Sequence, residues 1–198
     1  LWLGGAYPNG YLQIYDPNRG LVRKITHLDI AEIKMIRIGG INAFAVYEGT
    51  TSNNIGILEF ELDDEGLPNY KDYYTNFTDA AITEIRDLDI FQDSLYITTD
   101  LGIFRGNFIE DNLKSATNWD VLYSENNAKQ FLPFNDGINN GSYVITDSLI
   151  FNNQTGNWLE TYDIFNRWPY CEKPDSEGNL VTCPSSSSDS FCEGYNFN

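Results

Sequence analysis

Cysteine is absent from the first 170 residues of this 198-residue chain, and histidine occurs only once. Hydrolysis by a nucleophile–histidine pair needs a histidine base beside a serine or cysteine, and the one histidine, His27, follows a strand-like run as a surface or loop residue. The spacings of Cys171, Cys183 and Cys192 match no common zinc-ligand pattern. The sequence therefore offers no catalytic residue and no metal ligand, and we predict that the protein is not an enzyme.

Basic residues are also scarce, because 12 Lys and Arg stand against 29 Asp and Glu, for a formal net charge of −17. Such an acidic surface repels phosphate backbones and anionic lipid headgroups, so we expect no nucleic-acid partner. No run approaches the roughly 20 apolar residues that a membrane-spanning helix needs, so we expect no membrane insertion in this segment. The chain starts on a strand-like run, Leu1-Trp2-Leu3, without a basic leader, and we interpret it as a piece of a longer protein.

The three cysteines all lie at the C-terminal end of the chain. Disulfides persist only in oxidising compartments, so this distribution indicates a location outside the cytoplasm. Either Cys171 and Cys183 or Cys183 and Cys192 could form the bond, and the odd count leaves one thiol over. We expect an extracellular, cell-surface or periplasmic protein.

Aromatic residues are abundant, at 15% of the chain, and they mark a repeat. Four short strand-like runs each carry an aromatic residue in second place, namely Trp2, Phe44, Tyr96 and Tyr143, at intervals of 42, 52 and 47 residues. Polar and apolar residues alternate in runs such as Ile57 to Leu62, which is the two-residue period of a half-buried strand. Repeats of four short strands at this spacing are typical of a β-propeller.

We therefore predict an all-β fold, a β-propeller segment of about three full four-stranded blades plus part of another, excerpted from a larger propeller. The partial blade spans residues 1–28, and the full blades span residues 31–77, 82–125 and 128–165. A β-sandwich is the alternative, since short strands suit it as well. Residues 1–166 form the propeller part, with one possible helical turn at 111–114. Residues 167–198, rich in Cys and Ser, are expected to form a loop-rich extension or linker.

One repeat also resembles a known family. The run from Leu95 to Arg105, Leu-Tyr-Ile-Thr-Thr-Asp-Leu-Gly-Ile-Phe-Arg, looks like the repeat of the two-component-regulator β-propeller family, and Leu1 to Gly5 resembles the same core. The run Ala43 to Gly49 departs from it by lacking the tryptophan, and Ser148 replaces the turn glycine. The resemblance implies a propeller similar to the periplasmic sensor regions of hybrid histidine kinases, or to surface and secreted proteins of the Bacteroidetes type IX secretion pathway.

Exposed aromatic residues can stack on sugars or on a protein partner. The weak candidates for such a ligand surface are Tyr70, Tyr73 and Tyr74, together with Trp168 and Tyr170. The competing interpretation is that these residues close the seams between blades or cap an edge.

Paired carboxylates could support glycoside cleavage, which some propellers perform. The cluster Asp63-Asp64-Glu65 stands in a glycine-terminated turn, where Asp is favoured because it bonds its own backbone. Asp87 and Asp89 alternate with apolar residues along a strand, so we expect them to face solvent. A calcium site is the one cofactor considered, at Asn135-Asp136 with Asn139, but a hairpin turn explains those residues. We predict no cofactor.

These observations favour a non-catalytic binding or assembly module of a secreted or cell-surface bacterial protein. Its partner would be a protein or a polysaccharide at the cell surface. The alternatives are a periplasmic ligand-sensing propeller of a hybrid two-component receptor and a carbohydrate-active propeller enzyme. A fold resemblance alone does not choose among them.

Overall fold

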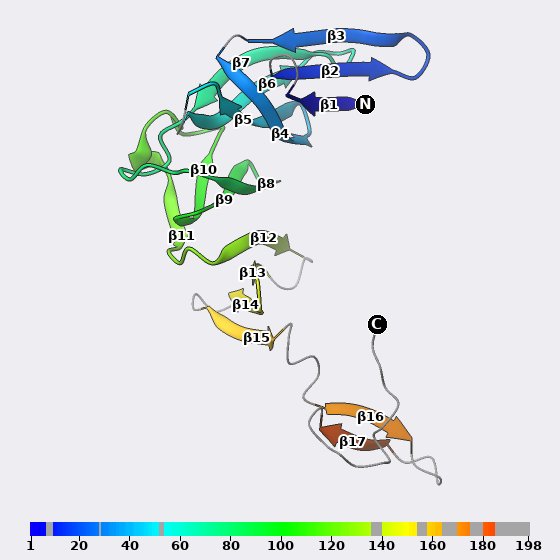
Figure 1. Cartoon of the computed structure of the whole chain (residues 1–198), viewed down its shortest axis with the longest axis vertical. Coiled ribbons are helices and arrows are strands. Elements are labelled where there is room, and N and C mark those ends of the chain that lie inside the picture. The colour runs from blue at the N-terminus through cyan, green and yellow to red at the C-terminus, as the bar shows by residue number, and fades with distance from the viewer. Residues whose placement is uncertain are drawn as a thin grey trace.

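The protein is built from β-strands that form four successive antiparallel sheets and a separate hairpin (Figure 1). The computed structural model describes residues 1–6, 10–27, 29–51, 54–135, 140–153, 158–163, 170–174 and 180–184. Sheet A contains β1 (Trp2–Gly5), β2 (Tyr11–Asp16) and β3 (Gly20–Thr26). Sheet B contains β4 (Ile30–Gly39), β5 (Asn42–Gly49), β6 (Ile55–Leu62) and β7 (Pro68–Tyr74). Sheet C contains β8 (Ile85–Phe91), β9 (Ser94–Thr99), β10 (Gly102–Asn107) and β11 (Asp120–Tyr123).

The remaining strands belong to the C-terminal part of the chain. Sheet D contains β12 (Ala128–Asn135), β13 (Asn140–Thr146), β14 (Leu149–Asn153) and β15 (Leu159–Asp163). The hairpin is formed by β16 (Tyr170–Pro174) and β17 (Leu180–Pro184). Strands that follow each other in sequence pair antiparallel within every sheet, so each sheet is a meander.

Turn chemistry explains why the meanders reverse where they do. Between β2 and β3 the Asp16 carboxylate accepts hydrogen bonds from the N–H groups of Asn18 (2.8 Å) and Arg19 (3.0 Å). Gly20 follows with a φ of +79°, a left-handed conformation that costs glycine little because it has no Cβ. An aspartate that bonds its own turn and a glycine that closes it are the expected pairing.

The sheets pack face to face in chain order (Figure 1). β4 contacts β1 on one side and β8 on the other, and β8 in turn contacts β12. This row of meanders, with three strands in sheet A and four in each of sheets B, C and D, is a β-propeller segment, and within the described residues the sheets do not close into a ring. The all-β prediction and the choice of a propeller over a sandwich are confirmed.

The repeated aromatic residues fill the interfaces between consecutive sheets. Trp2 packs in the cluster between sheets A and B, and Phe44 is fully buried between sheets B and C. Tyr96 packs between sheets C and D, where its ring stacks on Phe131 with centroids 5.0 Å apart. The aromatic register of the repeat therefore points the first three of these residues at the next sheet. Tyr143 stacks on Phe134 of its own sheet, with centroids 5.3 Å apart.

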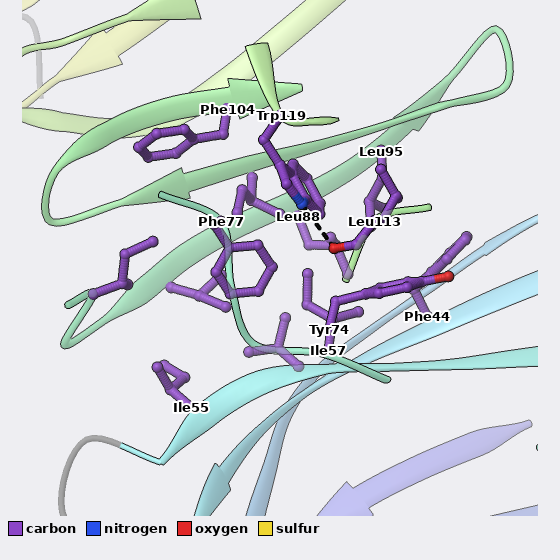
Figure 2. Close-up of a cluster of buried hydrophobic side chains, with 14 of the residues drawn as sticks. Phe44, Ile55, Ile57, Tyr74, Phe77, Leu88, Leu95, Phe104, Leu113 and Trp119 are labelled. Atoms are coloured by element: carbon purple, nitrogen blue, oxygen red, sulfur yellow. Dashed lines mark hydrogen bonds between the residues drawn. The ribbon is translucent and has the colours of Figure 1, made fainter. Parts of the chain in front are cut away.

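The interface between sheets B and C holds the largest core (Figure 2). Leu88, Leu95 and Ile97 of sheet C meet the side chains of sheet B there. Phe77 lies in the middle of the cluster, with its ring edge-to-face against Trp119 at 5.0 Å between centroids. The Trp119 indole Nε1 donates to the Leu113 carbonyl (3.0 Å), so the one polar atom of this buried ring is satisfied.

Sheets C and D each have the same kind of turn between their second and third strands. The Thr99 hydroxyl donates to the Gly102 carbonyl, and the Thr146 hydroxyl donates to the Leu149 carbonyl, both at 3.0 Å. The structure thus aligns Leu149, and not Ser148, with the turn glycine. The threonine hydroxyl is the common feature because it holds the turn with or without glycine.

Two local elements were not predicted from the sequence. Within the extension, whose loop-rich character stays a prediction, β16 and β17 form a hairpin, and neither strand alternates polar and apolar residues. The helical turn expected at 111–114 is absent there, and a 3-10 helix spans Ala116–Asn118 instead. Local polar side chains fix that loop, because the Asn118 side-chain amide donates to the Asn112 carbonyl (2.9 Å).

Candidate ligand-binding groove

The facing surfaces of sheets A and B leave a groove of about 710 Å³ between them, which we call the A–B groove. This volume lies within the range of about 300–1,000 Å³ that small-molecule sites occupy. Its walls come from strands β2 and β3 on one side and β4 to β7 on the other, and from the connection at residues 27–29. The aromatic and ionisable residues among its lining are Tyr11, His27, Asp29, Tyr47, Phe60, Tyr70 and Tyr73.

Apolar side chains form the floor of the A–B groove. Leu12 of β2 and Phe60 of β6 are almost completely buried there, and Ile33 of β4 lies between the two sheets. Each projects inward because alternate residues of a strand face the same side. Such a floor favours an apolar part of a ligand, since burying apolar area contributes about 25 cal/mol per Å².

Tyr70 and Tyr73 form the outer wall of the A–B groove on β7, and both are well exposed, at 59% and 48%. Strict alternation would place residues 70 and 73 on opposite faces of the strand. A bulge at Lys71 removes this conflict, because Phe60 pairs with Tyr70 while Leu58 pairs with Tyr73. The Tyr70 ring also packs edge-to-face on Phe60, with centroids 6.2 Å apart.

Tyr74, the third tyrosine of the predicted cluster, does not reach the groove. It is buried on the opposite face of sheet B, in the core shared with sheet C, and its hydroxyl donates to the Glu59 carboxylate. The Lys71 ammonium lies 2.8 Å from the other carboxylate oxygen of Glu59. Burial, first, and then the Glu59 carboxylate raise the pKa of Tyr74 well above its ordinary value. The predicted ligand surface is therefore split, with Tyr70 and Tyr73 on one side and Tyr74 on the other.

His27 and Asp29 supply the polar end of the A–B groove. The His27 Nδ1 accepts a hydrogen bond from the Asp29 N–H (3.2 Å), and it lies 3.6 Å from the Asp29 carboxylate. Because Nδ1 acts as an acceptor here, the second distance describes a close contact and not a strong ion pair. Both side chains are exposed, and neither adjoins a serine or cysteine nucleophile among the lining residues. This end of the groove offers hydrogen bonds and one negative charge to a ligand.

Two tyrosines of the A–B groove, Tyr47 and Tyr70, stay uncharged at neutral pH. Burial raises the pKa of Tyr47 above its ordinary value, and the neighbouring Tyr73 and Tyr70 hydroxyl groups add to the rise. Burial also raises the pKa of Tyr70, where the Asp72 carboxylate adds to the rise and the Lys114 ammonium opposes it. Neutral phenols can donate and accept hydrogen bonds and can stack through their rings. Sequence reasoning missed Tyr47, which ends a continuous buried run of β5 and carries no separate signal.

The carboxylate pairs considered for catalysis have structural roles. The Asp63 carboxylate accepts the N–H groups of Glu65 (3.0 Å) and Leu67 (2.8 Å), as expected for a turn. Asp87 was expected to face solvent, but only 7% of it is exposed, because β8 lies between the neighbouring strands β4 and β12, which cover both of its faces. Burial raises its pKa although the Arg37 guanidinium lies 3.3 Å away.

The other predicted residues are placed as follows. Cys171 lies directly opposite Cys183 in the β16–β17 pairing, and Tyr170 begins β16. Trp168 and Cys192 lie outside the described residues, as do Asp136 and Asn139 of the calcium candidate. In the described ranges no group of three or more His, Cys, Asp or Glu residues is arranged to hold a metal ion. Within those same ranges, no helix has the length and apolar character that spanning a membrane requires.

The comparison with known proteins identifies no relative. No protein-family model matches the chain, and no curated protein matches it. The fold and the A–B groove therefore define the class of protein by themselves, as a β-propeller segment with a tyrosine-lined groove between its first two sheets.

Proposed function

We propose that this chain is a non-catalytic binding module of a secreted or cell-surface bacterial protein, and that the A–B groove is its ligand site. The observation that carries the proposal is the combination of an apolar floor with the exposed rings of Tyr70 and Tyr73. Concave apolar sites with a few polar groups at the rim are the usual form of a ligand pocket. Tyrosine is also enriched at recognition surfaces, because it offers large contact area at low entropic cost.

The packing of the groove favours binding over a structural role for these tyrosines. A ring that only closed a seam between blades would be buried, as Tyr74 and Phe77 are in the next interface. Tyr70 and Tyr73 remain exposed although their faces adjoin an apolar floor. A ligand that stacked on them would bury this apolar area.

A binding screen tests the proposal. The labelled chain is applied to an array of bacterial surface oligosaccharides and to an array of short peptides, and hits are measured by calorimetry. We expect the double variant Tyr70→Ala/Tyr73→Ala to lose the hits and Ile109→Ala to retain them, since Ile109 is similarly exposed but lies outside the groove. Hits that survive the double variant would place the ligand elsewhere. Chemical conversion of a hit, seen by mass spectrometry, would overturn the non-catalytic assignment.

The location outside the cytoplasm is supported by the pairing of Cys171 with Cys183. Directly opposed residues of an antiparallel pair have Cα atoms about 4.5–5.5 Å apart. A disulfide accommodates Cα separations of roughly 4.4–6.8 Å. We propose that these two cysteines form the disulfide, in preference to Cys183 with Cys192.

Alkylation and intact mass of the protein isolated from its source test this bond. We expect one cysteine to react before reduction and three after it, with residues 171 and 183 in one cross-linked peptide. Three reactive thiols before reduction would remove both the disulfide and the argument for an oxidising compartment.

A further inference from the structure

The charged groups around the A–B groove are unequally distributed. The lining residues include the Asp29 carboxylate and the His27 imidazole, and they include no Lys or Arg. The surrounding chain has a formal net charge of −17. A ligand that enters the groove therefore meets one fixed negative charge within a negative field, which repels anions and attracts cations.

The basic residues nearest the groove already have partners. The Lys114 ammonium binds the Asp72 carboxylate (2.6 Å) and lies 5.3 Å from the centroid of the Tyr73 ring. Lys24 lies 5.3 Å from the centroid of the Tyr11 ring. Arg23 donates to the Pro68 carbonyl and so joins the outer strands β3 and β7. None of these three side chains is among the residues that line the groove, and the charge of Lys114 is balanced by the Asp72 carboxylate.

The same contacts show what the tyrosine rings attract. Two of the rings that line the groove, Tyr11 and Tyr73, each have an ammonium group within 6 Å of the centroid. An aromatic ring attracts a cation over its face through its quadrupole. Tyr70 also lines the groove with a well-exposed ring, on the same side of sheet B as Tyr73.

From this arrangement we infer that the A–B groove binds an amphipathic cation, a compact aromatic or aliphatic body that carries one ammonium or guanidinium group. The inference rests on the proposed function and specifies its ligand. The apolar body lies on the floor formed by Leu12, Leu58 and Phe60. The cationic group lies at the rim, where Asp29 supplies a carboxylate and the tyrosines supply rings among the lining residues. A basic and aromatic pair of side chains in a peptide would present the same chemistry.

The test uses three probes that share a phenyl ring and differ in charge, namely phenethylamine, phenethyl alcohol and phenylacetate. Each is titrated into the isotope-labelled 198-residue chain, and the shifts of backbone amide signals at the groove are followed by NMR. An exposed charge pair contributes up to about 1 kcal/mol, so we expect phenethylamine to bind about three- to fivefold tighter than the alcohol. Phenylacetate should bind most weakly.

Two variants separate the contributions of charge and rings. Asp29→Asn is nearly isosteric, and it should bring the affinity for phenethylamine close to that for the alcohol. Tyr70→Ala/Tyr73→Ala should weaken all three probes, whereas Ile109→Ala should change none. Circular dichroism checks that each variant is folded.

The outcomes distinguish an error in the ligand class from an error in the proposed site. If the probes bind at the groove without regard to charge, or if phenylacetate binds best, the ligand class is wrong and the groove remains a binding site. The absence of shifts at the groove with any probe at millimolar concentration would overturn both the ligand class and the proposed site. Shifts of the same amides on dilution of the protein alone would show that a second copy of the chain occupies the groove, which would also overturn the inference.

Discussion

Two interfaces of this molecule, one between sheets A and B and one between sheets B and C, are built from the same repeat. They differ in how completely side chains fill them. Both receive an aromatic residue from the second strand of the repeat, Trp2 in one case and Phe44 in the other. The B–C interface is a continuous core, whereas the A–B interface contains a groove of about 710 Å³. The repeat therefore specifies that consecutive sheets pack together. It does not specify how completely side chains fill the space between them.

Connection length accounts for much of the difference. The chain passes from β7 to β8 through residues 75–84, and this connection inserts Phe77 and Ile82 into the B–C core. The chain passes from β3 to β4 through residues 27–29 only. This short connection carries His27 and Asp29, which line the groove and do not fill it.

A second insertion reinforces the contrast. The loop between β10 and β11, residues 108–119, contributes Phe108, Leu113 and Trp119 to the B–C core. The corresponding turn between β6 and β7 spans residues 63–67 and is closed by the Asp63 carboxylate. The long loop adds three buried side chains to the B–C core, whereas the short turn adds only the partly buried Leu67 to the A–B cluster.

The largest expected effect contrasts one aromatic residue from each interface. Phe77→Ala should lower the free energy of unfolding by about 3–5 kcal/mol, because it opens a cavity in the B–C core. Tyr70→Ala should change it by less than about 0.5 kcal/mol, since that ring is already mostly exposed. Urea denaturation of both variants measures the two values. Equal losses would mean that the groove wall is part of the core.

The next largest effect on the free energy of unfolding is expected at the buried carboxylate of Glu59. Glu59 is fully buried and faces sheet C, where it accepts the Tyr74 hydroxyl and pairs with Lys71. Glu59→Ala should cost about 1–3 kcal/mol, because it leaves the buried Tyr74 hydroxyl unsatisfied. Glu59→Gln should cost less, since it keeps an acceptor. Glu61→Ala, at an exposed position two residues along β6, is the matched control and should be nearly neutral.

Alkaline pH should weaken the B–C interface through Tyr74. The folded state raises the pKa of Tyr74 above its ordinary 10.0, so above that pH the unfolded chain loses the proton first. The stability contributed by the protonated hydroxyl is therefore complete below pH 10 and declines as pH rises further, by at most about 1.4 kcal/mol per pH unit. Tyr74→Phe should reduce this slope. An unchanged slope in denaturation curves between pH 10 and 11 would contradict the assignment.

The smallest effect compares two adjacent threonines of β9. Thr99 is buried and its hydroxyl donates to the Gly102 carbonyl (3.0 Å), so Thr99→Val should cost about 1 kcal/mol. Thr98 is also buried, and among the described residues its hydroxyl oxygen is a buried polar atom without a hydrogen-bond partner. Thr98→Val should therefore be neutral or slightly stabilising. Thermal unfolding of the pair provides the measurement, and a larger loss for Thr98→Val would show that its hydroxyl has a partner.

The sequence was a good guide wherever the signal was local. Alternation in Ile57 to Leu62 predicted a strand, and β6 covers that run. The spacing of the aromatic residues predicted separate four-stranded units, and they occupy consecutive sheets. The threonine and glycine of the third repeat marked a turn, which forms at residues 99–102.

The sequence was a poor guide wherever a bulge or a distant contact decided the outcome. One extra residue, Lys71, brings Tyr70 and Tyr73 to the same face, and periodicity alone would have separated them. Contacts of β8 with β4 and β12, strands of two other sheets, bury the Asp87 carboxylate that alternation assigned to solvent. The A–B groove had no signal in the sequence, because its two walls come from strands of different repeats.

The sequence by itself determined the all-β class, the succession of repeated units and the acidic character of the surface. These properties follow from two-residue alternation, turn residues and composition, which act over a few neighbours. Only the tertiary structure decided which faces of the sheets carry the exposed tyrosines and which interface stays open. The physical reason is that burial depends on the side chains that fill the space between two sheets, and those side chains come from connections whose length and path no local pattern specifies.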